Sequence, residues 1–148
     1  MKNFFRFSMC AVILAITLVS CGGGSDDDIT GGGKGSKLSP PSWLQGNWGD
    51  ENGIIVIYKV TKDDVFMMGK SLKTYVNQSG GGASASLKET KNTSSLYELT
   101  IKADDGEGTK ASFIWSFKKG DGTYIDAAFI ETGNAPAADD YDKLYKKQ

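Results

Sequence analysis

The chain has 148 residues, with 17 basic and 18 acidic side chains, no histidine and two cysteines. A net charge of −1 argues against a nucleic-acid-binding protein, which would carry a basic patch. Both cysteines, Cys10 and Cys21, lie near the N-terminus, so the rest of the chain has no thiol nucleophile, Ser-His-Asp triad or zinc site built on His or Cys.

Residues 1–20 have the pattern of a secretory signal. Lys2 and Arg6 form a short basic region, and the stretch from Met9 to Val19 is apolar apart from Thr17. This run is shorter than the ~20 apolar residues that a transmembrane helix needs. It fits the apolar region of a signal peptide, so we expect residues 1–20 to be removed.

The signal ends in Leu18-Val19-Ser20-Cys21, which resembles the lipobox of bacterial lipoproteins. The resemblance implies that the Cys21 sulfur receives a diacylglyceryl group, that the signal is cut before Cys21, and that the new amine is acylated. Two or more acyl chains hold a protein stably in a lipid bilayer, so no transmembrane helix is expected. An ordinary signal with an incidental cysteine is the alternative.

An acidic cluster follows the lipobox closely, after three glycines. A cluster at this place resembles the surface-export signal of Bacteroidota-type lipoproteins, which implies an outer-membrane lipid anchor facing the cell exterior. A solvated acidic linker is the alternative. The residues of the expected export signal are Ser25, Asp26, Asp27 and Asp28.

The stretch from Gly22 to Pro41 is mostly Gly, Ser, Asp and Lys. It cannot bury a core, so we predict that residues 21–41 comprise the lipidated cysteine and a flexible tether. Loss of Lys2 and Arg6 with the signal would leave 15 lysines against 18 acids, a net charge of −3. Because Arg6 is the only arginine, the mature protein could not recognise phosphate or carboxylate through a guanidinium fork.

Residues 42–148 are predicted to form one all-β domain, because β-branched and aromatic residues alternate with polar ones. Gly/Asp turns at 104–108 and 119–122 predict hairpins. About eight strands in up-and-down order favour a small antiparallel barrel or a strongly curled meander. Residues 137–147 fit either a short C-terminal helix or a final strand. The predicted strands lie around Trp48 and at 54–61, 65–68, 71–78, 83–90, 97–102, 111–117 and 124–132.

The sequence Gly46-Asn47-Trp48 resembles the G-x-W signature of lipocalins. The resemblance implies a lipocalin-like (calycin) barrel whose closed end is plugged by tryptophan, so we assign Trp43, Gly46 and Trp48 to the plug rather than to ligand stacking. Lipocalins pair the tryptophan with a late arginine, which is missing here. A lysine such as Lys118 or Lys143 is expected to cover the ring instead.

Three aromatic residues lie at every second position of one predicted strand, so their side chains are expected on the same face of the sheet. They are Phe113, Trp115 and Phe117. They are candidates for lining a ligand pocket, and ordinary core packing is the alternative. The acids of the predicted turns could hold calcium, but turn chemistry accounts for them without an ion, so no metal and no cofactor is expected. These acids are Asp104, Asp105, Glu107 and Asp121.

Three functions are compatible with this pattern. We expect a surface-tethered barrel that binds a small apolar or amphipathic ligand. The first alternative is an interaction or structural subunit with a filled barrel, whose protein partner the sequence does not name. The second is an enzyme, which is not expected, because paired carboxylates must face each other across a cleft and the acids here fall mainly in turns and on polar strand faces.

Overall fold

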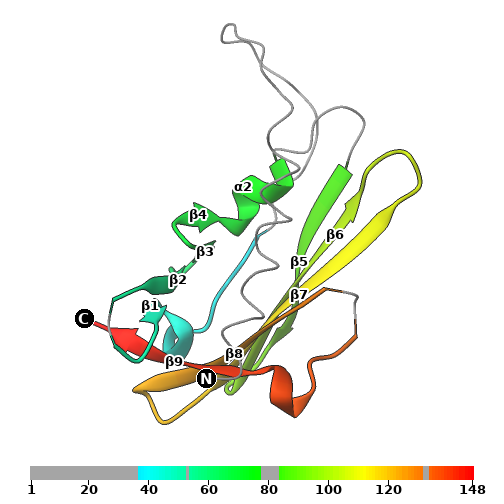
Figure 1. The fold of residues 1–148 in the computed structure, drawn as a ribbon. Coiled ribbons are helices and arrows are strands. Elements are labelled where there is room, and N and C mark those ends of the chain that lie inside the picture. The colour runs from blue at the N-terminus through cyan, green and yellow to red at the C-terminus, as the bar shows by residue number, and fades with distance from the viewer. Residues whose placement is uncertain (1–36, 53, 78–83, 132–133) are drawn as a thin grey trace, which may run out of the picture. The chain divides into compact units, whose positions relative to one another are not determined.

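A computed structural model of the protein describes residues 37–52, 54–77, 84–131 and 134–148 (Figure 1). All of these fall within the structural unit Gly33–Gln148. The predicted signal, the lipidation site Cys21 and the acidic tract lie outside the described residues. No helix in the described part of the chain is long and apolar enough to cross a membrane.

The described residues form one antiparallel sheet in the order β4-β3-β2-β1-β9-β8-β7-β6-β5. The prediction of an all-β, up-and-down antiparallel fold is therefore confirmed. The strands are β1 (Gly46–Gly49), β2 (Val56–Val60), β3 (Val65–Met67), β4 (Lys70–Ser71), β5 (Ser84–Asn92), β6 (Leu96–Asp104), β7 (Lys110–Lys119), β8 (Tyr124–Glu131) and β9 (Asp142–Lys147).

The sheet curls into a half-barrel (Figure 1). Its first and last strands are joined, because β9 pairs with both β1 and β8. The one break in the order among the described residues falls between β4 and β5, and helix α2 (Leu72–Asn77) stands there in the sequence. The two unpaired edges of the half-barrel are thus β4 and β5, which come from the middle of the sequence, whereas the first and last strands are paired with each other.

Helix α2 replaces the strand predicted at 71–78, so that prediction is wrong. Leu72 is fully buried and Val76 packs against the core. Their spacing of four residues suits one face of a helix as well as one face of a strand. The Ser71 hydroxyl accepts hydrogen bonds from the amides of Lys73 (3.1 Å) and Thr74 (3.4 Å), which is N-cap geometry and favours the helix.

The C-terminal segment is the final strand, and the alternative of a short α-helix is wrong. A 3-10 turn, η3 (Ala138–Asp140), precedes β9. Asn47 of β1 pairs with Lys147, and Ile125 of β8 pairs with Leu144, whose side chain is buried. A strand satisfies the backbone edges of both neighbours, which a helix would leave unpaired.

The packed region begins ahead of the predicted domain start at Ser42. Leu38 is buried in the core cluster. The Ser39 amide donates to Glu89 Oε2 at 2.9 Å, and Asn92 Nδ2 donates to the Ser39 carbonyl at 2.8 Å. Both partners belong to β5, so the last residues of the predicted tether lie along the strand that borders the break.

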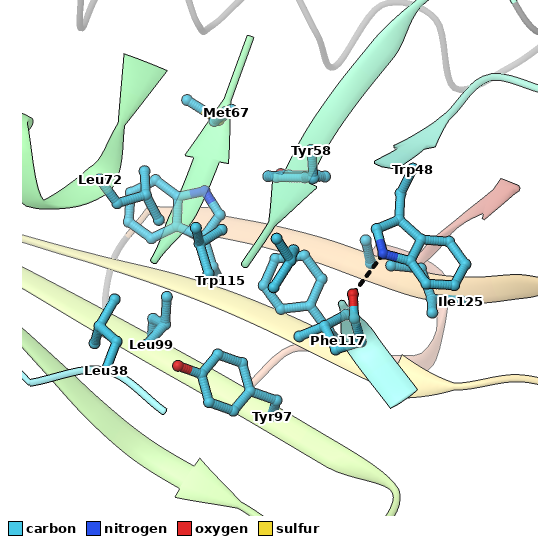
Figure 2. Close-up of a cluster of buried hydrophobic side chains, with 14 of the residues drawn as sticks. Leu38, Trp48, Tyr58, Met67, Leu72, Tyr97, Leu99, Trp115, Phe117 and Ile125 are labelled. Atoms are coloured by element: carbon cyan, nitrogen blue, oxygen red, sulfur yellow. Dashed lines mark hydrogen bonds between the residues drawn. The ribbon is translucent and has the colours of Figure 1, made fainter. Parts of the chain in front are cut away.

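The core lies on the inner face of the curled sheet (Figure 2). Tyr97, Leu99, Trp115 and Phe117 occupy alternate positions of β6 and β7 and are all buried. The Tyr58 ring of β2 meets the Phe117 ring edge-on, with centroids 5.1 Å apart. The inner face is therefore filled by interlocking aromatic and aliphatic side chains where β2 faces β7.

Candidate functional site

One end of the half-barrel is closed by the 3-10 turn η2 (Ser42–Leu44), which precedes β1. Leu44 is fully buried and accepts a hydrogen bond at its carbonyl from Trp48 Nε1 at 2.6 Å. Trp43 is half-buried, and its Nε1 donates to the Thr93 carbonyl in the β5–β6 turn at 3.3 Å. η2 is thus fastened to two sides of the sheet, and we call this the closed end.

Trp48 is buried at the closed end, and a lysine covers its ring. Lys146 Nζ lies 5.5 Å from the ring centroid, because Lys146 is the cross-strand partner of Trp48 on β9. The expected candidates, Lys118 and Lys143, lie over the rings of Tyr141 and Tyr124 instead. The expectation about Lys118 and Lys143 was wrong. Lys146 can be identified as the neighbour of Trp48 only once the C-terminal segment is known to be a strand paired with β1.

Gly46 has a positive φ of 133°, a conformation that L side chains rarely adopt. A Cβ atom there would lie 3.2 Å from Lys146 Cε. The backbone therefore favours glycine at the start of β1, beside the lysine that covers Trp48. That Trp43, Gly46 and Trp48 act as a plug stays a prediction.

The opposite end, where β6 ends and β7 begins, is open. Ala85, Ala103 and Ala111 are cross-strand neighbours on β5, β6 and β7, and none of them is fully buried. A hollow of about 780 Å³ lies here, and apart from the alanines its lining is polar or charged: Ser84, Ser86, Lys102, Asp104, Thr109, Lys110, Ser112 and Glu131. The small alanine side chains leave room that the bulky core residues occupy elsewhere.

Next to this open end stands an aromatic cluster of Phe113, Trp115 and Phe129. Phe113 and Phe129 are half-buried and stack with centroids 6.0 Å apart and an interplanar angle of 6°. Trp115 lies deeper, 3% exposed, with its centroid 4.8 Å from that of Phe129. The two phenylalanine rings thus form a partly exposed wall that leads to a buried indole.

Of the three predicted lining residues, Phe113 and Trp115 lie together, with centroids 6.4 Å apart. Phe117 lies apart from them, fully buried against Tyr58. Phe129 was missed by the sequence reasoning, although it shares its parity on the predicted strand with Ile125 and Ala127. The missing information was the register, which places Phe129 opposite Trp115.

The Trp115 Nε1 atom is buried and has no hydrogen-bond partner in the described part of the chain. Figure 2 places its indole beside Leu72, on the side of the core where Met67 lies. Most buried polar side-chain atoms are hydrogen-bonded, and an unsatisfied one costs about 1–3 kcal/mol. This donor is therefore an exception within an otherwise apolar interior.

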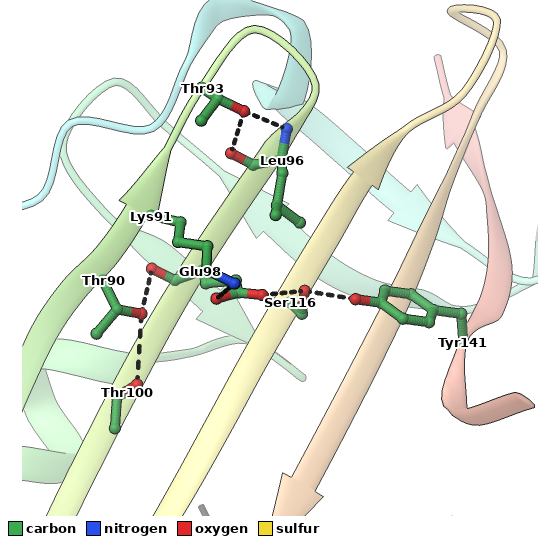
Figure 3. A network of polar contacts seen from close by, with 8 residues as sticks. All are labelled: Thr90, Lys91, Thr93, Leu96, Glu98, Thr100, Ser116 and Tyr141. Carbon is green, nitrogen blue, oxygen red and sulfur yellow. Dashed lines mark hydrogen bonds and ion pairs between the residues drawn. The ribbon is translucent and has the colours of Figure 1, made fainter. Parts of the chain in front are cut away.

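A buried polar network lies on the outer face of the sheet (Figure 3). Glu98 Oε2 forms an ion pair with Lys91 Nζ at 3.0 Å, and Glu98 Oε1 accepts from Ser116 Oγ at 3.2 Å. Ser116 Oγ also lies 2.8 Å from Tyr141 Oη. Because Ser116 is fully buried, no reactant reaches its hydroxyl, and the network joins β5, β6 and β7 to the residue before β9.

A second carboxylate, Glu89, holds the N-terminal segment. It accepts hydrogen bonds from the Ser39 amide and from Tyr97 Oη, both at 2.9 Å. Partial burial raises the pKa of Glu89, but the hydrogen bonds from Ser39, Asn92 and Tyr97 outweigh it and leave the pKa below its ordinary value. Burial, with Glu89 beside it, raises the pKa of Tyr97, so this phenol stays protonated.

The turn aspartates act as backbone acceptors. Asp105 Oδ1 accepts from the amides of Glu107 (2.8 Å) and Thr109 (2.9 Å), and Asp121 Oδ1 accepts from the Thr123 amide (2.9 Å). These bonds fix hairpin turns, as the turn interpretation of the sequence expects. In the described ranges, no group of three or more potential ligand side chains could hold a metal ion.

Comparisons of the chain with protein-family models, with curated proteins and with solved structures found no match. The fold and the open end define a small antiparallel half-barrel with one closed end and an aromatic interior.

Proposed function

We propose that the protein is a lipid-anchored lipoprotein, displayed on the cell surface, whose half-barrel binds a small apolar or amphipathic ligand at its open end. The observation that carries the proposal is the half-buried Phe113–Phe129 stack beside a hollow of about 780 Å³. Ligand sites are concave and use apolar and aromatic surface, which here comes from the stack, since the lining of the hollow itself is mostly polar. We propose binding and not catalysis as the activity.

The anchoring part of the proposal derives from the sequence alone. The lipobox ending at Cys21 supports a bilayer anchor through acyl chains, and the acidic tract supports an outer-membrane location facing the exterior. A lipocalin-like barrel held just outside a membrane would have access to apolar molecules that leave the lipid phase. No nucleic acid and no cofactor enters the proposal.

The second candidate is an interaction or structural subunit. It is favoured by exposed apolar side chains, which often mark contact sites with other proteins. In the described residues, Ile54 is 81% exposed and Met68 is 59% exposed. Ile55 and Val56, next to Ile54, are also exposed. These residues flank the β1–β2 and β3–β4 turns and not the aromatic cluster, so the two candidates can be separated by mutation.

The test is a fluorescence titration of the unit Gly33–Gln148 with N-phenylnaphthylamine, an apolar probe. Phe129→Ala removes one ring of the stack, and Ile54→Ala is the matched control at an exposed apolar position. Ligand binding predicts saturable binding that Phe129→Ala weakens and Ile54→Ala leaves unchanged. No saturable binding, together with a change of oligomeric state in Ile54→Ala, would favour the second candidate.

A further inference from the structure

We infer that the ligand is a neutral apolar molecule carrying a hydrogen-bond acceptor oxygen, such as an ester or a ketone, and that this oxygen binds to Trp115 Nε1. The inference rests on the proposed function and specifies the chemistry of the same site. Indole is a donor only, so its partner must be an acceptor. Trp115 Nε1 is buried and has no partner in the described ranges.

The other two tryptophans provide a comparison within the chain. Trp43 Nε1 donates to the Thr93 carbonyl, and Trp48 Nε1 donates to the Leu44 carbonyl. Both are satisfied by the protein at the closed end. Only Trp115, whose ring contacts Phe113 and Phe129, lacks a partner among the described tryptophans, so the missing acceptor belongs to the aromatic cluster that adjoins the hollow.

The surroundings of Trp115 select a neutral acceptor. Its ring neighbours are Phe113 and Phe129, and it belongs to the apolar cluster that also contains Leu72. A carboxylate placed here would need a cation to offset its desolvation. The domain has no arginine, so only a lysine could provide that charge.

The lysines of the neighbouring strands face away from Trp115. Three lysines of β6 and β7 lie on the outer face of the sheet, at positions that alternate with the core residues, as does Ser116 of the outer-face network. They are Lys102, Lys110 and Lys118. Lys118 Nζ lies 3.6 Å from the Tyr141 ring centroid, and Lys110 Nζ lies 3.7 Å from Asp104 Oδ2. Lys102 and Lys110 do line the hollow, but from the outer-face positions of β6 and β7, so neither lies beside the Trp115 indole on the inner face.

The charged residues of the hollow do not favour an anion. Glu131 is the cross-strand partner of Phe113 and is exposed beside the hollow. Together with Asp104 it balances the charges of Lys102 and Lys110, so the lining gives an anionic head group no net attraction. A neutral ester or ketone needs no counter-charge, places its chain against the rings, and gives the indole the acceptor that it lacks.

The experiment uses the full chain in lipid nanodiscs and follows the three indole N–H resonances by NMR. The probes share one alkyl chain and are methyl laurate, laurate and dodecane, with empty nanodiscs as the blank. We expect methyl laurate to shift the Trp115 indole proton downfield and to leave the Trp43 and Trp48 resonances in place. Laurate and dodecane should cause no comparable shift.

Calorimetry on two variants gives a second measurement. Trp115→Phe keeps an aromatic ring without the donor and should weaken methyl laurate binding about three- to tenfold, the equivalent of one net hydrogen bond. Trp43→Phe, the matched control, should bind as the unmodified protein does. The NMR measurement on the unmodified chain keeps the inference testable if Trp115→Phe does not fold.

Three results would overturn the inference. If laurate binds more tightly than methyl laurate, the site accepts an anion. If all three probes bind without moving the Trp115 resonance, the donor has no role and the proposed ligand binding still stands. If no probe binds and N-phenylnaphthylamine does not bind either, the inference and the proposed function fail together.

Discussion

Trp48 and Trp115 lie on the same inner face of the sheet but differ in how their indole N–H groups are used. Trp48 donates to the Leu44 carbonyl and lies under Lys146, so both its polar atom and its ring have partners in the protein. Trp115 is equally buried, but its donor is unsatisfied in the described part of the chain. We therefore predict a structural role for Trp48, and we propose Trp115 as the residue of ligand recognition.

Trp48→Ala should destabilise the protein strongly. Truncating a buried tryptophan costs ~3–5 kcal/mol, and here the change also removes the bond that holds η2. Chemical denaturation of both proteins measures the difference in the free energy of unfolding. A loss below about 1 kcal/mol would place Trp48 in the range of a surface residue and contradict its role as a plug.

Glu89 should make the fastening of the N-terminal segment sensitive to acid. Its pKa is lowered in the folded protein, so its contribution to stability is present above its unfolded pKa of 4.5 and is lost as the pH falls through the lower folded value. Glu89→Gln should be less stable at neutral pH and should lose less stability on acidification. Unfolding midpoints measured from neutral to acid pH check this, and parallel profiles for the two proteins would contradict it.

Strands in which apolar and polar residues alternate strictly could be predicted from the sequence. Segments whose apolar spacing fits both a helix and a strand could not. β6, β7 and β8 were predicted because one face of each packs on the core. α2 was missed because the spacing of Leu72 and Val76 suits both a helix and a strand, and the decisive signal was the capping hydroxyl of Ser71. The tail stayed open because only tertiary pairing with β1 and β8 selects a strand there.

The same distinction applies to the candidate site. The alternation within one strand was enough to predict that Phe113 and Trp115 share a face, and their rings do lie together. Phe129 depends on the β7–β8 register, and the missing partner of Trp115 depends on the packing of several elements. Neither follows from the spacing of residues within one strand.

Ser71→Ala should destabilise α2 by about 0.5–2 kcal/mol, the usual cost of losing an N-cap side chain. The Ser71 hydroxyl also donates to Asp64 Oδ2 at 2.6 Å, which ties the helix to the loop before β3. Ser71→Thr keeps the hydroxyl and serves as the matched control. Equal unfolding free energies for Ser71→Ala and the unmodified protein would show that the cap does not stabilise α2.

The closed end, the open end and the proposed anchor have separate roles. η2 and β9 close one end, and the long strands β5, β6 and β7 extend to form the open one. The Ser39–Glu89 hydrogen bond fixes where the chain joins the half-barrel. Leu38 and Ser39, the last part of the predicted tether, therefore belong to the packing of the domain.

Cys21→Ser should abolish membrane anchoring without disturbing the folded domain, because Cys21 lies outside the unit Gly33–Gln148. The variant should appear in the soluble fraction or remain as an uncut precursor. Cell fractionation and mass measurement of the product check both possibilities. A processed variant that still partitions into detergent would contradict the lipoprotein assignment.

We propose that the half-barrel holds a small molecule. Native mass spectrometry of the full chain, purified from the membranes of the cells that make it, measures this. We expect a population whose mass exceeds that of the protein with its proposed acyl chains by one small molecule, which is released on activation as a neutral species containing oxygen. A single population with the mass of the protein and these acyl chains alone would contradict ligand binding.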